Sequence, residues 1–235
     1  MYNKGLRAPG GRRKAADLHC FSGSSFYEGF DSACRAIKSS PMSSGTAFEL
    51  IPAFFHFSGA GDIGALLTHP VQTATRDAAD REWASRMDRF SQDHEFRFVR
   101  RGGNLSFAED TGYTYRDRIW NDGQLDKILS LISERRETRQ ALLMVYNPSL
   151  DVDRLSKGRI PCSIGYQVFL RQGALHMVYM MRTADLINIF AADLYLAEKL
   201  KSHFAEKLSV ISGDLTVLVN NLHVYREDMG RLAGY

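Results

Sequence analysis

Side chains that could carry out chemistry are concentrated between residues 159 and 225. Cys162 follows a proline, and Arg182 ends a run that is otherwise apolar. A cysteine thiolate is a strong nucleophile where positive charge lies nearby, and the planar guanidinium group of arginine suits phosphate. The same stretch also carries Asp193, His223 and Tyr225. Together these groups could attack an electron-poor ring, hold a phosphate and bind a sugar.

Each of these residues also has a purely structural interpretation. Cys162 could be an inert core cysteine, because free cysteines are among the most buried side chains. Arg182 could simply pair with Asp185, since a buried charge needs a partner. His223 and Tyr225 alternate along the chain and therefore share one face of a predicted strand, where they could be a half-exposed pair. The residue types alone leave both interpretations open.

The order and spacing of these groups resemble those of the thymidylate synthase superfamily. Three tracts carry the resemblance: Arg159-Ile-Pro-Cys162, Met181-Arg-Thr-Ala-Asp185 and Asn221-Leu-His-Val-Tyr225. They resemble, in turn, the family's Pro-Cys nucleophile, its Arg-Ser-x-Asp element and its His-x-Tyr element. The 61-residue step from the cysteine to the histidine fits an ungapped alignment with that family. The resemblance implies an α+β, thymidylate synthase-like fold with one large mixed β-sheet and flanking helices.

The resemblance also implies roles for individual residues. Those expected to hold phosphate are Arg182, Thr183 and, reaching across a homodimer with shared active sites, Arg139. Those expected near the sugar or the base are His223, Tyr225, Gln167 and Tyr115. Catalytic roles fall to Cys162, Glu49 and Asp193, and Asp185 is expected to face a folate cosubstrate. Structural alternatives stay open for Arg139, as a surface arginine, and for Gln167 and Asp185, as buried polar residues.

Asp193 indicates which pyrimidine is the substrate. The thymidylate-forming members carry asparagine at the matching position, whereas the deoxycytidylate hydroxymethylases have aspartate there, 31 residues after the cysteine as in this chain. Cytosine presents an N4 amino donor and an N3 acceptor, which a carboxyl group sharing one proton can match. The hypothesis is a cytidylate (dCMP or CMP) 5-hydroxymethyltransferase that uses 5,10-methylenetetrahydrofolate and no metal. Asp193 could instead cap or pair on a helix surface.

The choice of sugar is open between ribose and deoxyribose. Thr183 stands where the family usually has serine and so keeps the hydroxyl found in the phage enzymes, which favours deoxycytidylate over cytidylate. The two substrates predict different biology. Deoxycytidylate implies phage DNA modification, and a ribonucleotide implies the synthesis of a nucleoside natural product.

Several positions depart from the family pattern and keep other functions open. Gln140 replaces the second of two paired arginines, Pro52 interrupts the helix start that Glu49 resembles, and ten residues follow Tyr225, so the tail that closes over the folate is expected to be short or missing. The alternatives are thymidylate synthase-type methylation of dUMP, a catalytically degenerate nucleotide-binding relative and, more weakly, a nucleic-acid-binding accessory protein.

Composition limits the class of protein. With 235 residues, 44% of them hydrophobic, the chain suits a single catalytic domain, expected over 17–235 after a basic, flexible tail at 1–16. A net charge of +3 is too balanced to indicate nucleic-acid binding. Three cysteines without metal-binding or framework spacing favour a reducing, cytoplasmic setting, or the host cytoplasm for a viral protein. No apolar run is long enough to predict a membrane span or a secretory signal.

Hydrophobic periodicity predicts the elements that must position these residues. Helices are expected over 25–39, 77–90, 125–135 and 186–204, and another over the apolar segment 48–57. The face of the second of these helices is expected to carry Trp83, Met87 and Phe90. Strands are expected over 141–146, 164–170 and 174–181, with at least one more within 208–225. The dipeptides Gly102-Gly103 and Asp122-Gly123 predict turns, and Arg171-Gln-Gly173 is expected to link two paired strands.

Overall fold

The computed structural model describes residues 18–23, 25–59, 63–91, 98–101, 104–107, 113–154 and 159–235. The predicted basic tail at 1–16 and the predicted Gly102-Gly103 turn lie outside these residues.

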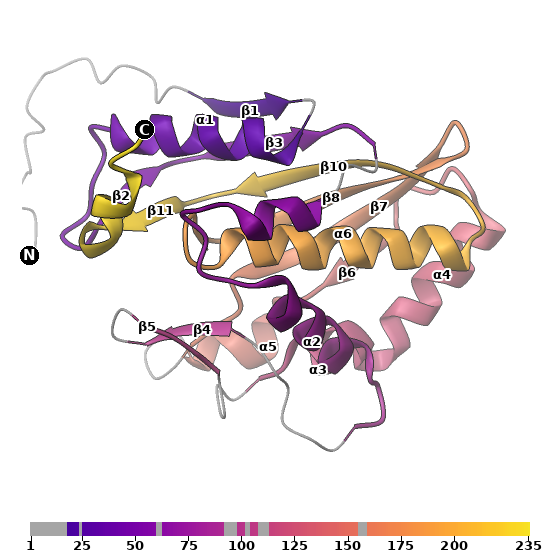
Figure 1. The fold of residues 1–235 in the computed structure, drawn as a ribbon. Helices are drawn as coiled ribbons and strands as arrows, with labels where there is room; N and C mark the ends of the chain where they lie inside the picture. The colour runs from indigo at the N-terminus through magenta and orange to yellow at the C-terminus, as the bar shows by residue number, and fades with distance from the viewer. Residues whose placement is uncertain are drawn as a thin grey trace, which may run out of the picture.

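A six-stranded mixed β-sheet occupies the centre of the molecule (Figure 1), in the order β1-β3-β10-β8-β7-β6. Its strands are β1 (His19–Gly23), β3 (Ala53–Phe57), β10 (Ile211–Val219), β8 (Ala174–Met181), β7 (Ser163–Arg171) and β6 (Leu142–Met144). β1 pairs with β3 in parallel, as β10 does with β8, and the other neighbours are antiparallel. This sheet confirms the predicted mixed α+β architecture.

Within the described ranges the sheet is accompanied by the α-helices α1 (Phe26–Lys38), α2 (Arg76–Met87), α3 (Tyr115–Trp120), α4 (Gln124–Glu134), α5 (Pro148–Asp151) and α6 (Phe190–Lys207). Short 3-10 turns are η1 (Ile63–Thr68), η2 (Asn121–Gly123), η3 (Val152–Arg154) and η4 (Arg226–Leu232). The structure confirms the helices expected at 25–39, 77–90 and 125–135. The face expected on the second is partly wrong, because Phe90 is 83% exposed, beyond the end of α2.

The prediction of a helix over 48–57 is wrong. This segment forms two strands, β2 (Ala47–Leu50) and β3, separated by Pro52 with a cis peptide bond. The physical reason is the burial pattern of β3, where Ala53, Phe55 and Phe57 are buried in alternation, the two-residue period of a strand. β2 belongs to a small sheet with β11 (Leu222–Tyr225) and β9 (Ala184–Asp185), and β4 (Phe98–Arg101) pairs with β5 (Asn104–Phe107).

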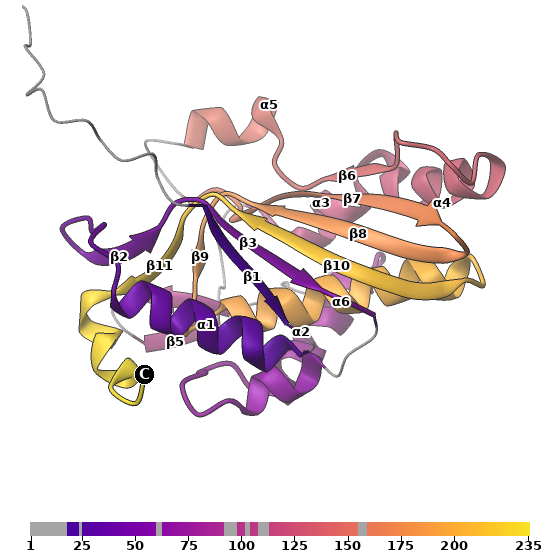
Figure 2. The ribbon, with the colours of Figure 1, turned by 90° about the horizontal axis from the view of Figure 1, so that it is seen from above.

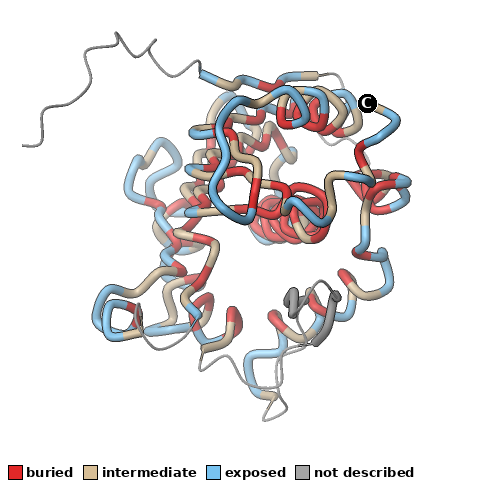
Figure 3. Tube along the Cα trace, turned by 90° about the vertical axis from the view of Figure 1, so that its left-hand side faces the viewer, coloured by how far each residue is buried: buried red, intermediate tan, exposed pale blue. Residues whose placement is uncertain are grey.

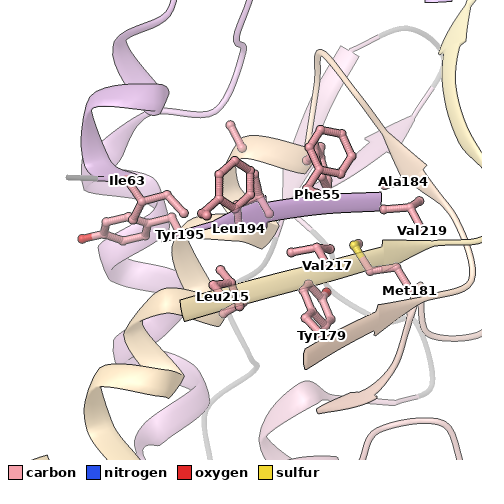
Figure 4. Packing of buried hydrophobic residues seen from close by; sticks show 14 of the residues in the cluster. Phe55, Ile63, Tyr179, Met181, Ala184, Leu194, Tyr195, Leu215, Val217 and Val219 are labelled. Carbon is pink, nitrogen blue, oxygen red and sulfur yellow. The ribbon is translucent and has the colours of Figure 1, made fainter. Parts of the chain in front are cut away.

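Helix α6 covers one face of the large sheet and is buried along most of its length (Figures 1 and 3). It contacts β8 and β10, while α1 packs on β1 and β3 on the same side (Figure 2). Figure 4 shows Leu194 and Tyr195 of α6 gathered with Phe55, Leu215 and Val217 of the strands. Complete burial of such side chains contributes about 1.5–3 kcal/mol each, so this packing fixes where α6 begins.

The opposite face of the large sheet carries apolar side chains that are only half-buried. They alternate with the core residues along each strand and include Phe54, Val178, Met180 and Leu218. At the β6 edge Leu142 and Met144 are 41% and 36% exposed. Among the described residues, this face therefore has an apolar character without the cover that α6 and α1 give to the other face.

The β7–β8 hairpin has the predicted turn. β7 ends at Arg171 and β8 begins at Ala174, and the two residues between them, Gln172 and Gly173, have φ angles of 50° and 77°. Positive φ at both positions is the conformation of a tight type I′ turn, which matches the twist of paired strands. The turn sets the register that brings the start of β7 beside the end of β8.

Gly165 generates the first testable prediction. The β7–β8 register shifts between Ser163 and Gly165, and a Cβ atom at Gly165 would lie 2.6 Å from the carbonyl oxygen of Leu143. Gly165→Ala should therefore push β6 away from β7 and lower the free energy of unfolding by about 1–3 kcal/mol. Urea unfolding measures this loss. Gly45→Ala is the control, because nothing lies within 4 Å of its Cβ position. Equal stability of the two variants would contradict the prediction.

Candidate active site

The nucleophile candidate lies where β7 begins. Cys162 is half-buried, so it is not sealed in the core, and its carbonyl oxygen accepts a 2.7 Å hydrogen bond from the backbone N–H of Arg182. The Arg182 Nε also lies 3.5 Å from the carbonyl oxygen of Pro161. Pairing of β7 with β8, as the sequence predicted, thus puts the Arg182 residue next to the Cys162 residue. Nearby positive charge favours the thiolate form of a cysteine.

A chain of buried hydroxyl groups lies behind the nucleophile. The Ser163 Oγ is 2.6 Å from the Tyr179 hydroxyl and donates to the Tyr115 hydroxyl at 3.3 Å. Tyr166 stacks on Tyr179 with ring centroids 4.5 Å apart. Burial raises the pKa of all three tyrosines, so they stay protonated at neutral pH. The next residue after Cys162 is therefore fixed by neutral hydrogen-bonding partners from α3 and β8.

Tyr115 lies in the electrostatic surroundings of both Cys162, the candidate nucleophile, and Asp193, the candidate for recognising the base. Thr114 caps helix α3 by accepting a hydrogen bond from the Asp117 backbone N–H, which places Tyr115 at the first helical position. Besides burial, negative charge on Cys162 or Asp193 raises the pKa of the Tyr115 hydroxyl, and the charge of Arg86 lowers it. These groups therefore share one electrostatic neighbourhood, although they come from four separate segments of the chain.

Asp193 lies in the first turn of α6 and is 8% exposed, which excludes the alternative of a solvent-facing helix residue. Within the described part of the chain, the structure shows no hydrogen bond to its carboxyl group. Burial raises the pKa of Asp193 to about 7, while the charge of Arg86 opposes this rise and those of Glu82 and Asp185 add to it. A carboxyl group with this pKa can take either protonation state near neutral pH.

His223 and Tyr225 share one face of β11, as their spacing predicted. Their rings lie 5.0 Å apart at an interplanar angle of 89°. The His223 Nδ1 is 3.1 Å from the Thr183 Oγ1, so the His-x-Tyr element contacts the element that carries Arg182. The structure thereby brings together two tracts that are 40 residues apart in the sequence.

Glu49 lies on strand β2, and the expected helix start at this residue is wrong. It is the cross-strand partner of His223, and Asn221 Nδ2 donates to its Oε1 at 3.1 Å. Asp185 is the partner of His223 on the other side of β11. Side chains of directly paired residues point to the same face of a sheet, so Glu49, His223 and Asp185 form one polar row.

Asn188 holds the Asp185 carboxyl group in place. Its Nδ2 donates to Asp185 Oδ2 and to Asp228 Oδ2, both at 3.0 Å. Its Oδ1 accepts from Thr73 Oγ1 at 2.9 Å and from Arg231 Nη1 at 2.8 Å. The sequence analysis did not identify Asn188 as a site residue. The side-chain amide supplies both donors and acceptors to a buried network, which the sequence did not reveal.

Gln167 and Arg139 lie away from this neighbourhood within one chain. Gln167 alternates with the buried residues Tyr166 and Val168 on β7 and so faces the opposite side of the sheet from α6. Its Nε2 donates to the carbonyl oxygen of Arg139 at 3.0 Å, and Arg139 itself is exposed between α4 and β6. The structure thus groups these two residues with each other rather than with Cys162 and Asp193.

Sequence reasoning missed the Glu82–Arg86 ion pair on α2. Both residues are buried, at 3% and 4% exposure. Their four-residue spacing was visible in the sequence, but opposite charges at this spacing usually lie on the solvent face of a helix. Within the described ranges, no group of histidine, cysteine, aspartate and glutamate side chains is arranged to hold a metal ion. The described helices also include none that is long and apolar enough to cross a bilayer.

The fold is similar to a known one. A solved structure of thymidylate synthase from T4 phage matches 84% of this chain and 76% of its own length, with a TM-score of 0.58 and 16% sequence identity. At this identity the match shows the fold alone, and it defines the chain as having the thymidylate synthase fold. A family model described as "Thymidylate synthase" matches residues 80–233. The chain therefore belongs to the thymidylate synthase family, as the resemblance of its motifs implied.

The chain is also similar to proteins from archaea and from phages. A protein of Methanococcoides burtonii, named provisionally as a thymidylate synthase, is 27% identical over 53% of this chain and 58% of its own length. Two proteins named deoxyuridylate hydroxymethyltransferase are also 27% identical. The one from Bacillus phage SP01 matches 78% of this chain and 44% of its own length, and the one from Pseudomonas phage M6 matches 55% and 37%. The chain thus spans roughly half the length of these relatives or less.

Asp193 generates a prediction about stability. Its folded-state pKa of about 7 is raised above the ordinary value, so the folded protein keeps this proton while the unfolded chain releases it near pH 4. Stability contributed by this group is therefore lost as pH rises from about 4 to about 7, and no further above that. Asp193→Asn removes the effect and should gain stability over the wild type across this window, by up to about 4 kcal/mol.

Urea unfolding at about pH 4.5 and about pH 8 measures the difference between the two proteins. Asp153→Asn, at an exposed aspartate, is the matched control for loss of one carboxylate. An Asp193→Asn effect that is the same at both pH values would show that the Asp193 carboxyl group ionises as freely in the folded protein as in the unfolded chain.

Proposed function

We propose that the protein is a cytidylate 5-hydroxymethyltransferase with 5,10-methylenetetrahydrofolate as the one-carbon donor. The family consists of folate-dependent one-carbon transferases that act on pyrimidine nucleoside monophosphates. The observation that carries the choice of cytosine is the buried Asp193 carboxyl group, to which no described residue donates a hydrogen bond. A neutral carboxyl group can donate to cytosine N3 and accept from the N4 amino group. Such a base would supply the partner that a buried polar group requires.

The chemistry proposed for Cys162 is covalent. The thiolate adds to C6 of the cytosine, which makes C5 nucleophilic toward the methylene carbon that the folate supplies. After C5 has bonded to this carbon, C5 loses its proton and tetrahydrofolate leaves with the electron pair of its bond to that carbon, so that an exocyclic methylene group remains on the base. Water adds to that group, and release of the thiolate from C6 restores the ring as 5-hydroxymethylcytosine. Protonation of N3 by Asp193 withdraws electrons from C6 and favours the first step.

The surrounding residues suit the rest of the nucleotide and the cosubstrate. Arg182 is exposed and adjacent to Cys162, which supports a phosphate-binding role, and Thr183 adds a hydroxyl donor. His223 and Tyr225 are proposed to hold the sugar. Glu49, in the same polar row as His223, is proposed to position water. Asp185 fits a contact with the folate ring because Asn188 fixes its carboxyl group in a buried position.

Hydroxymethylation of deoxyuridylate is the second candidate. Two phage relatives carry that activity in their names. A neutral Asp193 carboxyl group could also serve uracil, by donating to O4 and accepting from N3–H. An ionised carboxylate would repel O4 of uracil and N3 of cytosine alike. The protonation state of Asp193 therefore matters for either base, and a direct comparison of substrates is needed to separate them.

Release of the C5 hydrogen from labelled nucleotides tests the proposal. With dCMP, CMP and dUMP in parallel, we expect turnover of a cytidylate at least about 10-fold faster than of deoxyuridylate, because only cytosine N3 can take up the Asp193 proton and a hydrogen bond between charged groups is worth about 1.5–3 kcal/mol. Asp193→Asn should move the preference toward deoxyuridylate, and Cys162→Ala should abolish exchange. Turnover by the wild type with deoxyuridylate alone would overturn the cytosine assignment. Nucleotide binding without exchange, unchanged in Cys162→Ala, would favour a degenerate relative.

We further propose that the protein is a homodimer formed through the half-covered face of the large sheet. The support is the apolar surface of Phe54, Val178, Met180 and Leu218, which water would otherwise contact. Arg139 is exposed and bonded to Gln167 on this same side of the sheet. In a dimer of this kind Arg139, which lies away from its own chain's site, would reach the phosphate bound by the partner.

Mixing two inactive variants tests the shared site. Cys162→Ala and Arg139→Ala should each be inactive or nearly so alone. After unfolding and refolding together, about half of the dimers are mixed and hold one intact site, so activity should recover to about a quarter of the wild type. Arg136→Ala, at an exposed arginine in the same loop, is the control and should stay active. No recovery, with Arg139→Ala inactive, would indicate that Arg139 acts within its own chain.

A further inference from the structure

A buried ion pair on helix α2 lies beside the proposed base site. Arg86 Nη2 donates to Glu82 Oε1, and both side chains are almost completely buried. The carbonyl oxygen of Arg86 accepts a 3.1 Å hydrogen bond from Trp120 Nε1, which ties α2 to α3. A buried pair pays a large desolvation penalty and is often replaceable by apolar residues without loss of stability. Stability alone therefore does not account for charges at these two positions.

Arg86 contacts the ring that borders the nucleophile. Its guanidinium carbon lies 4.0 Å from the centroid of the Tyr115 ring, within the range of a cation–π interaction. The Tyr115 hydroxyl in turn accepts a hydrogen bond from Ser163, the residue next to Cys162. The buried side chain of Arg86 is thus connected, through Tyr115 and Ser163, to the residue that would bond to a pyrimidine.

The charged groups that act on Asp193 come mainly from this pair. The charges that act on the Asp193 carboxyl group are those of Glu82 and Arg86 on α2 and of Asp185 on β9, and Arg86 is the positive charge among them. Tyr115, Tyr166 and Tyr179 lie in the same neighbourhood from α3, β7 and β8 and are neutral, and Cys162 affects the same tyrosine as Asp193 does. The balance between Glu82 and Arg86 is therefore the adjustable charge near the Asp193 carboxyl group.

We propose that the Glu82–Arg86 pair is a positioning element of the active site, which orients Tyr115 and sets how readily Asp193 holds the proton it shares with the base. Neither residue is a catalytic residue, since both act through Tyr115 and Asp193. This inference rests on the proposed function. It adds that recognition of the pyrimidine depends on a pair of charges on α2 as well as on residue 193 itself.

The proposal predicts opposite effects of two substitutions. Only the protonated Asp193 can donate to the base, so the activity should fall as the pH rises and this proton is lost. This fall is the alkaline limb of the pH profile. Removing the negative charge in Glu82→Gln should move that alkaline limb to lower pH, and removing the positive charge in Arg86→Met should move it to higher pH. A nearby charge shifts the pKa of a carboxyl group by about 1–3 units, so each limb should move by about one unit or more.

The experiment is the pH profile of kcat/KM for release of the C5 hydrogen, measured on the full-length chain. The double variant Glu82→Gln/Arg86→Met should give an intermediate limb, and Asp193→Asn should lack this limb. Asp77→Asn and Arg81→Met are matched controls, because they remove the same charges at exposed positions of the same helix. Both controls should leave the limb in place. Circular dichroism establishes that each variant is folded before its profile is interpreted.

A second measurement does not need turnover. In protein labelled with carbon-13 at the aspartate carboxyl groups, the Asp193 signal, assigned by its loss in Asp193→Asn, should titrate in the same opposite directions in the two variants. Should a single variant fail to fold, the double variant still reports whether the limb and the signal depend on both charges. Shifts in one common direction, or none, would overturn the inference while leaving cytidylate turnover, and so the proposed function, intact. Titration shifts in the two expected directions, without turnover of a cytidylate, would overturn the proposed function and leave the inference about the charge pair intact.

Discussion

The constraint on which the site depends is the packing of α6 against the large sheet. That packing draws the first turn of α6 into the interior and buries the Asp193 carboxyl group, to which no described residue donates a hydrogen bond. A carboxyl group in such a place keeps its proton to a higher pH than in water. The interior therefore holds an acid that can act as donor and acceptor at once, which an exposed aspartate at the same helix position could not do.

The sheet supplies the other half of the arrangement. The tight turn between β7 and β8 sets a register in which the residue before β7 and the residue after β8 are bonded through their backbones, and these are Cys162 and Arg182. The small sheet adds the row of Glu49, His223 and Asp185 across three strands. Residues up to 174 positions apart in the chain, from Glu49 to His223, are thus positioned by main-chain hydrogen bonds, with little freedom left to individual side chains.

Much of this architecture could be predicted from the sequence, and the failures have physical causes. Strong three- and four-residue periodicity identified α1, and two apolar runs linked by a Gly-containing turn identified β7 and β8. The segment 48–57 was misassigned because a short, mainly apolar run fits a buried helix as well as a buried strand. In the structure Arg182 lies next to Cys162, and His223 contacts Thr183, so the three motifs come together. The Glu82–Arg86 pair was missed because the sequence does not record which face of α2 a tertiary contact will bury.

The role proposed for residue 193 implies that membership of the family alone does not determine the substrate. An amide has a fixed donor and a fixed acceptor, whereas a carboxyl group gains its donor only with a proton. A site built on aspartate therefore depends on whatever charges surround that proton, and here two of those charges, Glu82 and Arg86, lie on α2, outside the three tracts that carry the family resemblance. Two chains with the same motifs and the same aspartate could then differ in base preference or in working pH. Under the proposed function, substrate choice is a property of the buried electrostatic environment as much as of the residue proposed to contact the base.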